Sequence, residues 1–173
     1  MRSIRLRAVV PSDDVALVFK QVTDFASYPA ASPDVHSVEV LPATAPGEPQ
    51  HTVWEANFRR GVMRWTEQDQ IDPERLCVTF HQVDGDFDRF DGTWRLRPVD
   101  GGCEVLFEVA YDFGIDSLAG IMDPLAERVI KRAICAVLAG VVGEVAVVEG
   151  GAALTDLGEP PPMSGIRIVT GGD

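Results

Sequence analysis

The feature of this sequence that most restricts its fold is an alternation of apolar and polar residues that runs, with short interruptions, from about residue 35 to residue 113. A period of two is typical of β-strands with one buried face. It predicts six strands: VHSVEVL (35–41), HTVWEANF (51–58), VMRWTEQDQI (62–71), RLCVTFHQV (75–83), FDGTWRLR (90–97) and CEVLFEVAYDF (103–113). The segments between them are short and rich in turn-forming residues, so consecutive strands are expected to pair as antiparallel neighbours.

A seventh strand is predicted at the N-terminus, where residues 3–10 (SIRLRAVV) also alternate. Pro11 ends this strand, and Ser12 is the expected N-cap of a helix that continues to Val22. The segment DFASYPAASPD (24–34) predicts a second short helical turn, stopped by one of its prolines. Two short helices therefore follow the first strand.

The pattern changes to helical spacing after Ser117. Asp123 followed by Pro124 is a favourable helix start, and apolar residues then recur through the run AICAVLAGVVGEVAVV (133–148), which predicts a buried helix of about 25 residues. Residues 1–150 are expected to form one domain, and the Pro- and Gly-rich residues 151–173 a tail. These elements predict an α+β architecture, in which a curved seven-stranded antiparallel sheet wraps around the long C-terminal helix.

The strand at 62–71 is expected to place two carboxyl groups on its inner face. Its alternate positions Arg64, Thr66, Gln68 and Gln70 are all polar. The opposite face, which includes Trp65, Glu67 and Asp69, must therefore turn inward. The neighbouring segments add large rings to the same inner surface: Trp54, Phe87, Phe90, Trp94 and Tyr111.

Two ionisable groups among large rings would be costly if the interior were solid and dry. We therefore infer a cavity that admits polar groups or a ligand. The alternative is that Glu67 and Asp69 lie near the edge of the sheet and pair with a basic residue. The pattern alone favours neither interpretation.

Charge and composition exclude several classes of function. Fifteen basic and twenty-seven acidic residues give a net charge of −12, which disfavours nucleic acid as a partner. The run at 133–148 contains Glu144 and is shorter than the ~20 residues of a membrane span. The N-terminus lacks the apolar core of a secretory signal, so we expect a cytoplasmic protein. Three widely spaced cysteines form neither a disulfide framework nor a metal-ligand pattern.

Three segments of the chain resemble known sequence signatures: VTDFASYPAASPDVHSVEVL (22–41), RWTEQDQIDP (64–73) and VDGDFDRFDGTW (83–94). They are similar to those of the polyketide cyclase/dehydrase and coenzyme Q-binding families of the START-like, Bet v 1-like (SRPBCC) superfamily. This resemblance covers roughly residues 3–145 and implies the helix-grip fold. Within the superfamily, the chain looks most like the bacterial aromatase/cyclases, whose cavity between sheet and helix binds a poly-β-ketone.

The resemblance implies a set of pocket residues. Carried over position by position, it places in the pocket Tyr28, Ser32, Trp65, Glu67, Asp69, His81, Phe87, Phe90, Trp94 and Tyr111. The alternation adds Trp54 and Val109 to the inner surface but turns His81 outward, since Val78 and Phe80 of the same strand are apolar. Asp69 stands where the aromatase/cyclases place an arginine, so the same reaction is in doubt.

The leading hypothesis is a cofactor-independent enzyme that catalyses cyclisation or dehydration of a polyketide-type intermediate. Asp69 would be the general base and Glu67 the acid, because two nearby carboxyl groups in an apolar cavity differ in pKa. Tyr111 or His81 would hydrogen-bond a developing enolate. The alternative is a non-catalytic carrier of a quinone, isoprenoid or other lipid.

The expected partner depends on how the substrate arrives. A substrate delivered by an acyl carrier protein would need local positive charge, which Arg59, Arg60 and Arg64 would supply. No metal is expected, and the protein is expected to be a monomer or a homodimer.

Overall fold

A computed structural model describes residues 1–58, 61–114, 116–151 and 166–168 of the chain. All seven predicted strands form: β1 (Arg2–Val10), β2 (Val35–Leu41), β3 (Gln50–Phe58), β4 (Gly61–Asp72), β5 (Cys77–Gly85), β6 (Arg89–Val99) and β7 (Gly102–Asp112). Two short strands, β8 (Val145–Glu149) and β9 (Ile166–Ile168), extend them into a sheet with the order β2-β3-β4-β5-β6-β7-β1-β8-β9. Neighbouring strands are antiparallel except β8 and β9, which are parallel.

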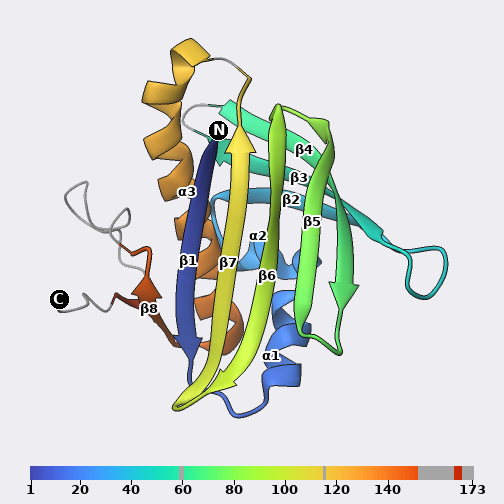
Figure 1. The fold of residues 1–173 in the computed structure, drawn as a ribbon, viewed down its shortest axis with the longest axis vertical. Helices are drawn as coiled ribbons and strands as arrows, with labels where there is room; N and C mark the ends of the chain where they lie inside the picture. Colours follow the sequence, from blue (N-terminus) through green and yellow to red (C-terminus); the bar gives the residue numbers. More distant parts are fainter. Residues whose placement is uncertain (59–60, 115, 152–165, 169–173) are drawn as a thin grey trace.

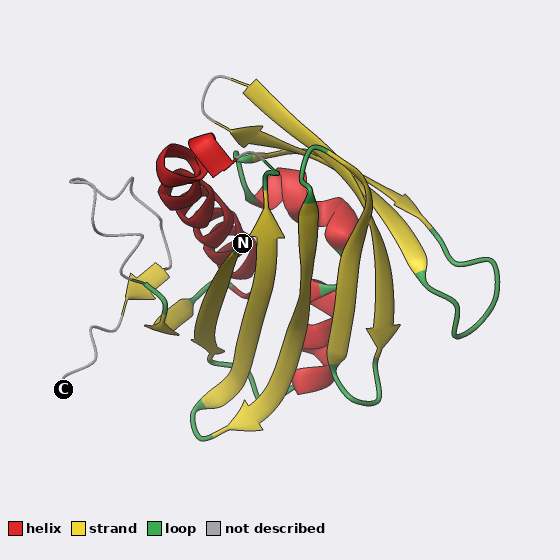
Figure 2. Ribbon diagram, turned by 45° about the horizontal axis from the view of Figure 1, so that its top comes forward, coloured by secondary structure: helices red, strands yellow, loops and turns green. Residues whose placement is uncertain are grey.

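The helices lie together on one side of this curved sheet (Figure 1; Figure 2). They are α1 (Val15–Val22), a 3₁₀ turn η1 (Phe25–Ser27), α2 (Tyr28–Ala31) and the long α3 (Asp116–Val142). The hydrophobic core lies between the inner face of the sheet and α3, and includes Leu6, Val105 and Leu138. This arrangement confirms the predicted helix-grip architecture, with short helices after β1 and one long helix after β7.

The predicted limits of the long helix were wrong at both ends. The chain leaves β7 through Gly114, whose φ of 72° turns it directly into a helix that begins at Asp116, so Pro124 lies inside the helix. The helix ends at Val142, because Gly143 adopts a φ of 83° and its N–H caps the carbonyl of Ala139. Residues 145–149 then form β8 instead of continuing the helix, which raises the strand number above the predicted seven.

Two smaller predictions also differ from the structure or fall outside it. Asp14, and not Ser12, caps α1, because its carboxylate accepts the backbone N–H of Leu17 at 3.0 Å. Most of the predicted tail and two of the proposed docking arginines, Arg59 and Arg60, lie outside the described residues. Arg64 is exposed and lies 3.8 Å from a carboxylate oxygen of Glu55. Among the described residues, no helix is long and apolar enough to cross a membrane.

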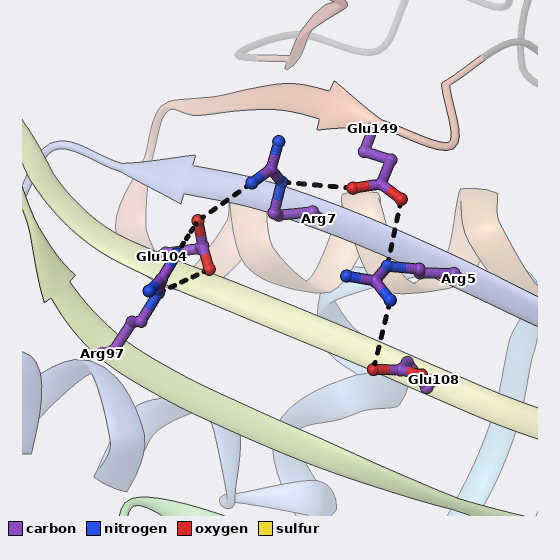
Figure 3. Close-up of polar contacts among 6 residues, drawn as sticks. All are labelled: Arg5, Arg7, Arg97, Glu104, Glu108 and Glu149. Carbon is purple, nitrogen blue, oxygen red and sulfur yellow. Dashed lines mark hydrogen bonds and ion pairs between the residues drawn. The ribbon is translucent and has the colours of Figure 1, made fainter.

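Ion pairs on the outer face of the sheet join β8 to three other strands (Figure 3). Glu149 of β8 lies 3.0 Å from Arg5 and 3.3 Å from Arg7, both on β1. Glu104 of β7 lies 3.6 Å from Arg7 and 2.8 Å from Arg97 of β6. The Arg97 guanidinium beside Glu104 holds the pKa of that carboxyl below its usual value. Most of these groups are exposed, so the network is not expected to contribute much to stability. We infer that it mainly orients the strands that it joins.

Gly92 permits close contact between three strands at the centre of the sheet. It pairs with Phe80 of β5 and with Val109 of β7. A Cβ atom at this position would lie 2.1 Å from the backbone oxygen of Glu108 and 2.7 Å from the ring of Phe80. The glycine therefore leaves room for the Phe80 ring, which lines the cavity described below.

We predict that Gly92→Ala destabilises the protein by about 2–4 kcal/mol, because the new methyl group must displace backbone atoms of β7. The control is Gly47→Ala, which meets no atom within 4 Å and changes only a left-handed turn with a φ of 82°. Its expected cost is about 1 kcal/mol. Chemical denaturation of both variants measures the difference, and equal costs would contradict this packing argument.

Candidate functional site

A cavity of about 100 Å³ lies between the inner face of the sheet and α3. Its lining is almost entirely aromatic and aliphatic. From the sheet side and the short helices come Phe25, Tyr28, Asp34, Val35, Trp54, Ala56, Trp65, Glu67, Phe80, Phe87, Phe90, Trp94 and Phe107. From α3 come Val129, Ile130, Ala133 and Ile134. An apolar cavity of about 150 Å³ holds a benzene molecule, so this smaller space encloses at most about one ring.

The cavity approaches the protein surface between α3 and the turn before β2. Most lining residues are buried, but Asp34 of that turn and Val129, Ile130 and Ala133 of α3 are half-buried. Arg132 of α3 spans the same gap, with its Nε 3.1 Å from Oδ2 of Asp34. We identify this gap as the mouth of the cavity.

Two parallel indole rings form one wall. Trp54 of β3 and Trp65 of β4 are directly paired across the strands, and their rings stack 5.9 Å apart at 6°. Phe25 and Tyr28 pack edge-on against Trp54, while Phe87 packs edge-on against Trp65. These mutual contacts hold both indoles in fixed positions.

The two indole N–H groups point toward the carboxyl groups of β4. Trp65 Nε1 donates to Glu67 Oε1 at 2.6 Å. Trp54 Nε1 donates to Thr52 Oγ1 at 2.7 Å, and the Thr52 hydroxyl donates to Asp69 Oδ2 at 2.7 Å. All five side chains come from the inner faces of two adjacent strands, because the alternation of β3 and β4 turns them to the same side.

Glu67 and Asp69 are both buried, with 5% and 1% of their surfaces exposed. Burial raises the pKa of Glu67 well above its usual value, and the neighbouring charge of Asp69 raises it further. Burial also raises the pKa of Asp69, but the hydrogen bond from Thr52 opposes that increase. Of the two, Glu67 is therefore the group whose protonated form the folded structure favours more.

Tyr28 contributes a ring to the cavity, with its hydroxyl already bonded. The hydroxyl donates to the backbone carbonyl of Val22 at 2.6 Å. Burial raises the pKa of Tyr28 well above its usual value, and the charges of Glu67 and Asp69 act in the same direction. Tyr28 is thus a neutral wall residue near the carboxyl pair.

The structure brings most of the predicted site residues to the cavity. Those that line it are Tyr28, Trp54, Trp65, Glu67, Phe87, Phe90 and Trp94. Asp69, Ser32, Val109 and Tyr111 are buried but do not line it. Ser32 accepts the backbone N–H of Asp34 in the turn before β2, and the ring of Tyr111 packs against Phe87 and Phe113.

His81 does not reach the cavity. It is exposed on the outer face of β5, because Val78 and Phe80 occupy the inner positions of the strand. The alternation indicated this orientation, and the pocket position implied by the resemblance was wrong. The bulge in the pairing of β4 with β5 lies beside Glu67, between Gln82 and Asp84, and leaves His81 paired outward opposite Gln68 and Asp91.

Several residues of the site were absent from the sequence-based prediction. The alternation of β3 already indicates that Thr52 lies on the same inner face as Trp54. Its hydrogen bond to Asp69 could not be predicted, because it depends on the register between β3 and β4. No sequence pattern predicted that Asp34 and Val35 would line the cavity. The helical lining residues belong to the predicted apolar face of α3, although the sequence does not indicate which of them meet empty space.

Among the described residues, no arginine, lysine or histidine lines the cavity. Within the same part of the chain, no group of three or more histidine, cysteine, aspartate or glutamate side chains is arranged to hold a metal ion. The groups of the site that can act chemically are therefore the carboxyl group of Glu67 at the wall, that of Asp69 behind it and that of Asp34 at the mouth, which is paired with Arg132. The rest of the lining consists of rings and aliphatic side chains.

Comparison with known families agrees with this geometry. The profile of the family described as "Polyketide cyclase / dehydrase and lipid transport" matches residues 13–138. The chain belongs to this family. The match extends from before α1 into α3 and so contains every lining residue of the cavity. A search of curated protein sequences finds no match.

Solved structures confirm that this member of the polyketide cyclase/dehydrase and lipid transport family has the START-like, Bet v 1-like fold. TTHA0849 from Thermus thermophilus is 24% identical over 82% of this chain and 95% of its own, with a TM-score of 0.71. The Zhui aromatase/cyclase from Streptomyces sp. R1128 is 21% identical over 82% and 92%, with a TM-score of 0.66. A START superfamily protein from Mycobacterium smegmatis is 12% identical over 82% and 94%, with a TM-score of 0.64.

We predict that Glu67→Gln stabilises the protein at alkaline pH. Because the folded state raises the pKa of Glu67, its contribution to stability is complete below the unfolded pKa of about 4.3 and is lost as the pH rises through the folded value. Glutamine stays neutral and still accepts the Trp65 N–H. We expect a higher melting temperature than wild type at pH 9, by at least about 2–4 °C, and little difference at pH 4.

The control for this measurement is Glu39→Gln, which removes a carboxylate from β2, away from the inner face of β4. It should leave the melting temperature within about 1 °C of wild type at both pH values. A Glu67→Gln variant that is less stable than wild type at pH 9 would show that the Glu67 charge is compensated in the folded protein.

Proposed function

We propose that this protein is a cofactor-independent cyclase or dehydratase that binds a hydrophobic, polyketide-type carbonyl compound in the cavity and uses Glu67 as general acid. The observation that carries this proposal is a buried carboxyl group, Glu67, in a cavity whose other acidic lining residue among those described, Asp34, lies at the mouth and is paired with Arg132. Such a carboxyl stays protonated near neutral pH and donates its proton to a bound oxygen atom. The family and the aromatase/cyclase among its structural neighbours support the same class of reaction.

A dehydration of a β-hydroxy ketone illustrates how the groups would act. Glu67 donates its proton to the departing hydroxyl, the C–O bond breaks, and water leaves. The Glu67 carboxylate, which is a strong base beside the charge of Asp69, takes the proton from the carbon next to the ketone as the C=C bond forms. Glu67 thus gives one proton, takes one and returns to its starting state.

In this scheme Asp69 acts on the substrate only through Glu67, because Asp69 does not line the cavity. This differs from the sequence-based hypothesis, in which Asp69 was the direct base. Tyr111 also has no place against the substrate, since it is buried outside the lining. The stacked indoles and the phenyl rings hold the reacting ring and exclude water.

The size of the cavity limits what it encloses. A space for roughly one ring holds the reacting segment of a chain, and the rest of the substrate extends through the mouth between α3 and the turn before β2. The Asp34–Arg132 ion pair at that mouth lies where the outer part of such a chain passes.

The second candidate is a carrier of a hydrophobic molecule, and the almost wholly apolar lining favours it. A carrier needs the rings and the volume but not the Glu67 proton. The two candidates therefore differ in their response to Glu67→Gln.

We predict that wild type dehydrates 4-hydroxy-4-phenylbutan-2-one, a one-ring β-hydroxy ketone, to the conjugated enone, which is followed by its ultraviolet absorbance. Glu67→Gln should lower the rate by about 10²-fold or more, the usual contribution of a general acid. Glu39→Gln should leave it unchanged. Equal rates in all three proteins would exclude Glu67 as the acid.

Ligand binding provides the independent test of the cavity. Ala133 lines the cavity from α3, so Ala133→Phe should fill it and weaken binding of acetophenone at least about tenfold, as measured by tryptophan fluorescence. Ala133→Ser keeps the space and should bind as wild type does. Binding that is lost in Ala133→Phe, together with no dehydration by wild type, would favour the carrier.

A further inference from the structure

Asp69 is a buried carboxyl group that makes no contact with the cavity. It lies two residues from Glu67 on the same inner face of β4, and only 1% of its surface is exposed. A buried carboxylate usually has a cation or several hydrogen-bond donors as partners. Asp69 has no arginine or lysine partner among the ion pairs of the described residues.

The hydrogen bonds of Asp69 account for only one of its oxygen atoms. Oδ2 accepts the Thr52 hydroxyl at 2.7 Å, and the oxygen of that hydroxyl accepts the Trp54 N–H at 2.7 Å. Oδ1 is buried and makes no direct hydrogen bond to a described residue. The side chains of Glu67 and of Gln50, which is paired with Asp69 across β3 and β4, both lower the pKa of Asp69 as hydrogen-bonding neighbours. An unsatisfied buried acceptor is costly, so a donor is missing from the site. A proton on the carboxyl of Glu67 would supply it.

The charges around Glu67 and Asp69 also indicate that the site needs a proton. Tyr28 of α2 is neutral, Asp34 at the mouth is paired with Arg132 of α3, and His51 of β3 is the basic group that lowers the pKa of Asp69. The described side chains of α3 that line the cavity are all apolar. Two adjacent negative charges in this setting would be strongly unfavourable, so one of the two carboxyl groups must be protonated.

We propose that Glu67 and Asp69 share a single proton, and that Asp69, fixed by Thr52, is a positioning residue that keeps this proton on Glu67. Asp69 accepts from Thr52 on one oxygen and from Glu67 on the other. Trp65 holds the opposite oxygen of the Glu67 carboxyl. The catalytic meaning of this arrangement rests on the proposed function, but the shared proton exists in the free protein.

The proposal also defines the ligand chemistry of the site. A neutral carboxyl donates a hydrogen bond, so the cavity favours a neutral carbonyl or hydroxyl oxygen. A carboxylate or phosphate would meet the negative charge of Asp69, with no basic side chain among the described residues of the cavity wall. Acetophenone should therefore bind, whereas benzoate, which has the same ring and an anionic group, should bind at least about tenfold more weakly.

The test is infrared spectroscopy of the free protein in D₂O from acidic to alkaline pH. Exposed carboxyl groups are ionised at neutral pH, since their pKa values lie near about 4. We expect one remaining C=O band of a protonated carboxyl in wild type. This band should be lost in Glu67→Gln and retained in Glu39→Gln. In Asp69→Asn it should disappear at a lower pH than in wild type, because the neighbouring charge is gone.

Thr52 supplies a second pair of variants in case Asp69→Asn does not fold. Thr52→Val removes the donor to Asp69, which strengthens the hold of Asp69 on the proton and should shift the frequency of the band. Thr52→Ser keeps the donor and should retain the wild-type spectrum. Absence of the band in wild type at neutral pH, or its persistence in Glu67→Gln, would overturn the proposal, as would an unchanged spectrum in Thr52→Val.

These results are independent of turnover. If wild type shows the band but dehydrates no ketone, the shared proton stands and the enzymatic proposal fails. If wild type dehydrates the ketone but shows no band, the enzymatic proposal stands and the shared-proton proposal fails. Where both are present, Asp69→Asn should move the alkaline limit of kcat/KM to lower pH, because Glu67 must be protonated to act as an acid.

Discussion

Burial of two carboxyl groups without a lysine or arginine partner among the described residues is the constraint on which the rest of this structure depends. Such a pair is unfavourable in an apolar interior, and the surrounding residues reduce that penalty in specific ways. Indole and hydroxyl donors from β3 and β4 occupy two carboxyl oxygens. The remaining penalty is lowest when one proton stays in the site. The stacked indoles therefore also act as hydrogen-bond donors, Trp65 directly to Glu67 and Trp54 to the hydroxyl that bonds Asp69.

If Glu67 and Asp69 share a proton as proposed, the same constraint would distinguish this protein from a simple hydrophobic container. A cavity lined only by rings would suit many apolar ligands, whereas a neutral acid at its wall distinguishes ligands by the presence of an oxygen acceptor. The negative charge behind that acid then disfavours anions. In this proposal, the ligand preference of this chain follows from one polar group in a rigid apolar cavity, and membership of the family alone does not determine it.

Much of the fold follows from the sequence because the period of a strand is short and its two faces differ. The alternation in β4 predicted that Glu67 and Asp69 turn inward, and the same rule placed His81 outside. It could not predict which of the two acids meets empty space, because that depends on the sizes of rings from other strands. It also could not predict the hydrogen bond between Thr52 and Asp69, since the register between β3 and β4 is a property of the folded sheet.

In the C-terminal region, residues 133–148 form one continuous apolar run, and hydrophobicity alone does not distinguish a buried helix from a buried strand. Gly143 decides the outcome, since its left-handed backbone ends α3.

The strand that follows Gly143 also covers part of one edge of the sheet. Without β8, the nine-residue β1 would form an open sheet edge with exposed backbone donors and acceptors, to which another chain could add a strand. β8 covers the Arg7–Val9 part of that edge, and Glu149 with Arg5 and Arg7 places paired charges beside it. A few residues after the glycine thus cover part of a strand edge that would otherwise be open to strand addition.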